Sequence, residues 1–183
     1  MNTLELRKLG AFGAGAAAFC SATVAAAMLA LVAVAHADRT PEAPANLQVP
    51  NGNKVAFRAY AVGVQIYRWN GTNWLFVAPE AVLFADAGNH GEVAIHYAGP
   101  TWESRSGSKV VGARVAGATV DPNAIPWLLL RAVSSEGPGI FHRVTFIQRV
   151  NTTGGNAPAA PGSSAGQEAR VPYTAEYYFY RAK

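Results

Sequence analysis

Residues 54–77 read KVAFRAYAVGVQIYRWNGTNWLFV, and their pattern sets the fold class of the whole chain. Both halves are rich in Val, Ile, Tyr, Phe and Trp, which favour β-strands. Asn70-Gly71 lies between them and is a strong signal for a two-residue hairpin turn. With that turn, Tyr67 would face Trp74 across the hairpin. One face of the pair would then be aliphatic and the other aromatic.

The β pattern continues through the rest of the chain. Further strands are expected at 80–86, 91–98, 101–105, 109–120, 127–133, 142–150 and 171–180. The apolar run 127–133 is short enough to be a strand or one or two helical turns, and we favour a strand. Eight or nine short strands without a long segment of helical periodicity predict an all-β fold, an antiparallel β-sandwich or barrel.

The first 37 residues have the features of a secretory signal peptide. Arg7-Lys8 is followed by an uncharged run from Leu9 to Ala35 and by the A-x-A site Ala35-His36-Ala37. We expect cleavage after Ala37 and a periplasmic or secreted protein that keeps no membrane contact. The run is also long enough to span a bilayer, so an uncleaved N-terminal anchor is the alternative.

One domain is expected after the signal peptide. Residues 38–53 contain three prolines and should form an extended arm, and 54–183 should form a single β-domain. The Gly/Pro/Ser-rich segment 152–167 predicts a mobile loop. Cys20 is the only cysteine and lies in the signal peptide, so the domain must be stable without disulfides.

The charge of the chain gives little support to a nucleic-acid partner. The formal net charge is +4 and the basic residues are scattered. Nucleic-acid-binding domains usually gather Lys and Arg on one face. We therefore expect neither a nucleic acid nor an anionic membrane as a partner.

The densest polar chemistry lies in residues 96–103, HYAGPTWE. Aromatic rings on a β surface can stack on a ligand, and neighbouring polar groups can hydrogen-bond it. We expect a glycan or another polar small molecule as the ligand. The candidate ligand-binding residues are His96, Trp102, Glu103, Lys109 and Trp127.

Each candidate also has a structural interpretation. The two tryptophans could cap the core, Glu103 and Lys109 could pair across a hairpin, and His96 could be a hydrogen-bonded structural residue. The face that Glu103 occupies depends on the register. With Gly107-Ser108 at the turn, Ser106 would face Lys109, and a longer loop would shift the pairing.

The alternation in 142–150 gives a further expectation about faces. It places Val144, Phe146 and Val150 on one face of a strand and Arg149 on the other.

Metal and catalytic signals are weak. His90, His96 and His142, with Asp86 or Glu103, match neither an HExxH helix nor an HxH pair, so no metal site and no cofactor is predicted. No serine occurs in the setting of an activated nucleophile. A hydrolase using Glu103 and Asp86 would require the fold to bring the two carboxylates together. We lean against an enzyme.

Several motifs occur together in a fixed order. They are Gln65-Ile66-Tyr67, Ala78-Pro79-Glu80-Ala81, the HYAGPTWE stretch, Ile125-Pro126-Trp127-Leu128-Leu129 and Ile147-Gln148-Arg149. In this order they resemble the secreted bacterial and fungal family known as domain of unknown function 3455, over nearly the whole of 38–183. The resemblance implies no activity, because none is established for the family.

The sequence therefore leaves the function open between two main hypotheses. The first is a non-catalytic exported β-domain with a ligand-binding face. The alternative is a structural, envelope-associated or extracellular protein without a small ligand. The oligomeric state is not predicted.

Overall fold

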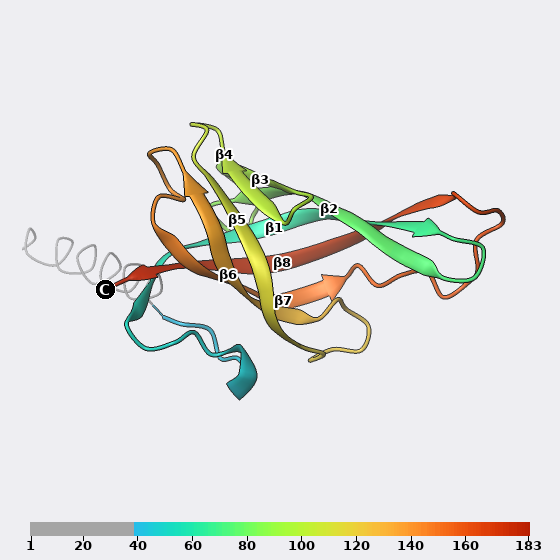
Figure 1. Cartoon of the computed structure of the whole chain (residues 1–183), viewed down its shortest axis with the longest axis horizontal. Helices are drawn as coiled ribbons and strands as arrows, with labels where there is room; N and C mark the ends of the chain where they lie inside the picture. The colour runs from blue at the N-terminus through green and yellow to red at the C-terminus, as the bar shows by residue number, and fades with distance from the viewer. Residues whose placement is uncertain (1–38) are drawn as a thin grey trace, which may run out of the picture. The chain divides into compact units, whose positions relative to one another are not determined.

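Eight antiparallel strands form one closed barrel in the part of the chain that the computed structural model describes, residues 39–183 (Figure 1). Each strand pairs with the next one along the chain, and β8 pairs with β1 to close the barrel. The predicted all-β antiparallel fold is confirmed, as a barrel. The strands are β1 (Asn53–Trp69), β2 (Trp74–Phe84), β3 (Glu92–Tyr97), β4 (Thr101–Ser104), β5 (Lys109–Ala118), β6 (Trp127–Glu136), β7 (Val144–Gly154) and β8 (Glu168–Ala182).

The first and last strands are the longest and run beside each other for almost their whole length. Their pairing extends from Asn53 opposite Ala182 to Arg68 opposite Glu168. The apolar run 127–133 lies in β6 and is a strand, as expected. Leu129 and Leu130 are both buried although consecutive side chains of a strand point to opposite faces, which explains why the periodicity of the run is weak.

The first hairpin has a wider turn than predicted. Trp74 pairs with Trp69 and not with Tyr67, so the turn contains four residues, 70–73. The side chain of Asn70 accounts for the difference. Its Oδ1 accepts hydrogen bonds from the backbone N–H groups two and three residues further on, at 2.9 and 2.8 Å, and so stabilises the longer turn.

The hairpin between β4 and β5 is also wider than the predicted two-residue turn. Lys109 faces Glu103 and not Ser106. The backbone N–H of Ser104 donates a hydrogen bond to the carbonyl of Ser108 at 2.9 Å. This bond closes the turn one residue beyond Glu103 and Lys109, the last pair of the β4–β5 ladder. Both hairpins show that a side-chain or backbone hydrogen bond inside the loop decides the register.

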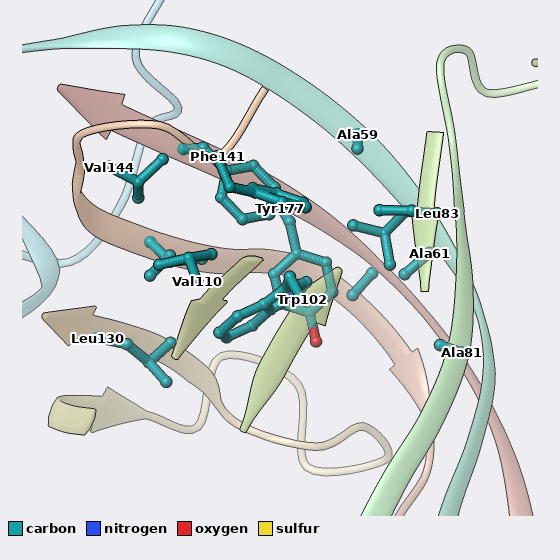
Figure 2. Packing of buried hydrophobic residues seen from close by; sticks show 14 of the residues in the cluster. Ala59, Ala61, Ala81, Leu83, Trp102, Val110, Leu130, Phe141, Val144 and Tyr177 are labelled. Atoms are coloured by element: carbon teal, nitrogen blue, oxygen red, sulfur yellow. The ribbon is translucent and has the colours of Figure 1, made fainter. Parts of the chain in front are cut away.

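Large aromatic side chains fill the middle of the barrel (Figure 2). Trp102, Phe141, Tyr177 and Phe179 are each at most 1% exposed. The same cluster contains small side chains from β1, β2 and β3: Ala59, Ala61, Ala81 and Ala94. Small residues on these strands leave room for the rings that β4, β8 and the β6–β7 loop contribute, so the interior is close-packed there.

One end of the barrel is closed where the β4–β5 and β6–β7 loops meet. Phe141 inserts from the β6–β7 loop and its backbone N–H donates to Ser108 Oγ at 3.3 Å. Ser104 Oγ lies 2.9 Å from both Ser106 Oγ and Ser108 Oγ. Ser108 is fully buried, and this network satisfies its hydroxyl group.

The segment before β1 packs on the outer face of the barrel. It contains one short 3-10 turn, η1 (Ala45–Leu47), whose Leu47 side chain is fully buried. Gln148 Nε2 donates to the Leu47 carbonyl at 2.7 Å, and the Tyr180 hydroxyl donates to Gln148 Oε1. The arm thus covers outward-facing side chains of β7 and β8.

Two sequence-based assignments concern the segments outside the barrel strands. The signal peptide at 1–37 lies outside the described residues. The Gly/Pro/Ser-rich segment 152–167 begins in β7, which continues to Gly154, and the loop itself spans 155–167. Within 39–183 no helix is long and apolar enough to cross a membrane.

Candidate functional site

A cavity of about 470 Å³ lies at the end of the barrel opposite the Phe141 closure. Residues from all eight strands line it, together with the β3–β4 turn and the segment just before β6. Trp102, Leu130 and Tyr177, which Figure 2 labels, separate the cavity from the packed middle of the barrel. The lining is mostly apolar and contains a few polar side chains.

His96 on β3 is one of these polar side chains, and it is 3% exposed. Its ring stacks on Trp102 with centroids 4.3 Å apart and planes 6° from parallel. Its Nδ1 lies 2.8 Å from the Thr101 carbonyl, so Nδ1 carries the proton and donates it there. Burial and, to a smaller extent, the nearby charge of Arg149 lower the pKa of His96 to about 3, although the hydrogen bond to Thr101 acts in the opposite direction. At pH 7 the ring is therefore neutral.

Arg149 on β7 is 9% exposed and is fixed inside the barrel. Its Nε and Nη2 donate to the Pro126 carbonyl at 3.2 and 2.8 Å. No carboxylate among residues 39–183 forms an ion pair with it. A buried guanidinium without a carboxylate partner is uncommon, because desolvation of a charge is costly.

Neutral polar groups complete the lining. The Tyr67 hydroxyl donates to the Gly155 carbonyl at 2.7 Å, and burial raises the pKa of Tyr67. The hydroxyl groups of Tyr173 and Tyr177 lie 3.5 Å apart. Gln65 is 3% exposed, and its Nε2 has no hydrogen-bond partner in the described part of the chain. None of these groups neutralises Arg149.

The segment before β6 is held firmly against β7. Thr152 Oγ1 donates to the Ile125 carbonyl at 2.6 Å, and the Ile125 backbone N–H donates to the Gly154 carbonyl at 2.9 Å. These bonds fix the Pro126 carbonyl that Arg149 contacts. The polar part of the cavity is thus preorganised by backbone groups.

A comparison with known families matches residues 50–181 to the family described as "Protein of unknown function (DUF3455)". The match spans all eight strands except the outermost residue of β8. The chain belongs to the DUF3455 family. No curated protein and no solved structure matches it.

Two of the five candidate ligand-binding residues of this DUF3455 domain line the cavity, His96 and Trp102. They lie opposite each other on β3 and β4. Trp102 is 1% exposed, and its ring contacts Tyr177 and Phe179 edge-on in addition to His96. Trp102 is therefore a core residue that also forms part of the cavity wall.

The other three candidates lie away from the cavity. Glu103 accepts a hydrogen bond from the Tyr97 hydroxyl at 2.6 Å. Lys109 pairs with Glu136 at 3.3 Å, although Glu103 is its cross-strand neighbour. Trp127 packs against an outer cluster of Val55, Val150, Tyr178 and Tyr180.

Arg149, which sequence reasoning did not select, is the most distinctive polar residue of the cavity. The alternation in 142–150 placed it opposite Val144, yet both side chains face the interior, whereas Phe146 packs outside. The pairing of β7 with β8 shifts between Val144 and Phe146. A bulge there inverts the in-and-out alternation of the residues that follow it, so strict period-two counting assigns the wrong face.

The arrangement offers binding groups without an evident reaction. Within 39–183 no group of three or more His, Cys, Asp and Glu side chains could hold a metal ion. Asp86 lies in the β2–β3 loop, where hydrogen bonds from the His90 and Gly88 backbone lower its pKa. Neither Asp86 nor Glu103, the two carboxylates of the hydrolase hypothesis, lines the cavity.

Proposed function

We propose that this DUF3455 domain binds a small organic molecule with a substantial apolar part in the cavity of its barrel. The observation that carries the proposal is the cavity itself, about 470 Å³ with a mostly apolar lining and a few fixed polar groups. Small-molecule sites usually have volumes of roughly 300–1,000 Å³ and this kind of lining. The polar groups are already positioned by backbone carbonyls, which reduces the entropy lost on binding.

This ligand class differs from the glycan suggested by the sequence. A glycan stacks on an exposed ring, whereas Trp102 is almost wholly buried and stacks on His96. The cavity wall is apolar on the β2 and β6 sides, where Val77, Leu128 and Leu130 contribute. An amphipathic molecule matches these surroundings better than a sugar with hydroxyl groups all round.

We further propose that binding takes place after export, in the periplasm or outside the cell. The support is the sequence of the first 37 residues, with its uncharged run and A-x-A site. In that setting a binding domain without a catalytic group would capture, carry or sense its ligand.

The test uses N-phenyl-1-naphthylamine, a neutral dye whose fluorescence rises in apolar surroundings. Titration into the purified domain should give a saturable, one-site increase. Leu128→Trp adds ring volume to the cavity lining and should weaken binding by about tenfold or more, which corresponds to about 1.4 kcal/mol.

The matched control is Val133→Trp on the same strand, where the side chain is 55% exposed. It adds the same ring to the outer surface and should leave the titration unchanged. Absence of saturable binding, or equal weakening by both variants, would exclude the cavity as the binding site.

A further inference from the structure

We infer that the ligand of this cavity is an organic carboxylate and that Arg149 binds its charged end. The inference rests on the proposed function and adds the chemical class of the ligand. It depends on the charge of the cavity, on the free donor of Arg149 and on the absence of an internal counter-ion in the described part of the chain.

The cavity has an uncompensated positive charge. Two arginines line it, Arg114 and Arg149, and no aspartate or glutamate of residues 39–183 does. Neither arginine forms an ion pair with a carboxylate of residues 39–183. His96 is neutral at pH 7 and adds no charge. A negatively charged ligand would supply the missing counter-charge in surroundings of low dielectric, where it counts most.

Arg149 has one donor group available for that purpose. Its Nε and Nη2 are committed to the Pro126 carbonyl. Its Nη1 makes no hydrogen bond with the described residues. This atom is accessible to solvent and faces the cavity that Arg149 lines. Because the Pro126 contacts already fix the guanidinium plane, a carboxylate that accepts from Nη1 meets a preorganised donor.

The number of donors favours a monoanion over a phosphate group. A buried phosphate dianion usually gathers several charged or backbone donors. Here one free guanidinium nitrogen is available deep in the cavity, and Arg114 is exposed at its rim. Arg114 is placed to attract an anion toward the mouth, and the apolar lining between the two arginines would contact the body of the ligand.

The experiment compares two probes of nearly identical shape, 2-naphthoate and 2-naphthamide, by isothermal titration calorimetry at pH 7. The first carries a carboxylate and the second a neutral amide. The wild-type domain should bind 2-naphthoate more tightly by roughly tenfold, the effect of one hydrogen bond between charged groups. Raised salt should weaken the binding of the carboxylate more than that of the amide.

Two variants locate the effect. Arg149→Gln removes the charge and keeps an amide donor, so it should bring the ratio of the two affinities close to one. Arg131→Gln makes the same change in net charge at an exposed position of β6 outside the cavity lining, and it should retain the preference. Circular dichroism shows whether each variant is folded. If Arg149→Gln does not fold, the wild-type preference decides alone.

The outcomes separate the two proposals. Equal affinities of the wild type for the two probes would overturn the carboxylate inference and leave the binding function standing. A preference that persists in folded Arg149→Gln would also overturn it. Failure of both probes and of the neutral dye to bind would overturn the inference and the proposed function together.

Discussion

His96 illustrates how one buried side chain can make the stability of the barrel depend on pH. Its ring lies between Trp102, which stacks on it, and the edge of Tyr177 at a centroid distance of 5.4 Å. Its ring donates a hydrogen bond to the Thr101 carbonyl, and among the described residues Arg149 is the charged group that acts on it. An imidazolium ion at this position would be desolvated and close to a second cation.

We therefore predict a loss of stability in mild acid that depends on His96. Its folded-state pKa of about 3 lies below the ordinary value of 6.5. Above pH 6.5 the ring is neutral in both states. As the pH falls from 6.5 toward 3, only the unfolded chain takes up this proton, which lowers the free energy of unfolding by about 1.4 kcal/mol per pH unit.

Urea unfolding at a series of pH values measures this slope. His96→Gln keeps an amide donor for the Thr101 carbonyl and should show a shallower decline. His142→Gln, at an exposed position, should decline like the wild type. Identical slopes in the wild type and His96→Gln would contradict the prediction.

Some of the individual residues that line the cavity could be predicted from the sequence. His96 and Trp102 stood out because they lie in a short stretch dense in polar and aromatic chemistry. Arg149 did not, since an arginine in an alternating strand normally faces solvent. Only the bulge in β7, which depends on pairing with β8, turns its side chain inward.

The positions of the strands could be predicted, because segments rich in Val, Ile, Tyr and Phe alternate with turns that contain Gly, Asn or Pro. The pairing registers of the strands could not be predicted. The Asn70 side chain in one turn and the Ser104–Ser108 backbone bond in the other each widen the loop. Whether such hydrogen bonds form depends on the backbone geometry of the turn, which the residue types alone do not determine.

The arm before β1 contributes to stability through one side chain. Leu47 is fully buried against the outside of the barrel, where Gln148 fixes its carbonyl. Leu47→Ala should lower the free energy of unfolding by roughly 2–5 kcal/mol, as in other packed interiors. Gln48→Ala, at the next and exposed position, should cost far less. Thermal unfolding of the two variants makes the comparison, and equal small effects would mean that the arm does not need its leucine.

The barrel as a whole is held by its continuous ladder and by its aromatic interior. No cysteine follows Cys20 in the sequence, so no disulfide can form within 38–183. Closure of the sheet gives β1 and β8 a strand partner on each side, so neither is an edge strand. Stability should therefore be independent of redox conditions and of metal ions.

This independence can be measured on protein recovered from the periplasm or medium of an expressing bacterium. Mass spectrometry should find a chain that begins at Asp38. Its melting temperature should be unchanged by dithiothreitol and by a chelator. A drop of several degrees with the chelator would reveal a metal contribution, and a retained Met1 in the membrane fraction would favour the anchor.

The seam between β1 and β8 joins residues that are at least a hundred positions apart, with Arg68 opposite Glu168 and Asn53 opposite Ala182. Contacts this distant in sequence form late and slow the folding of a chain. During synthesis, β1 remains without this partner until the ribosome has made the chain as far as β8. A chain that stops before β8 therefore leaves one side of β1 unpaired and the barrel open, which should make it a good substrate for proteases.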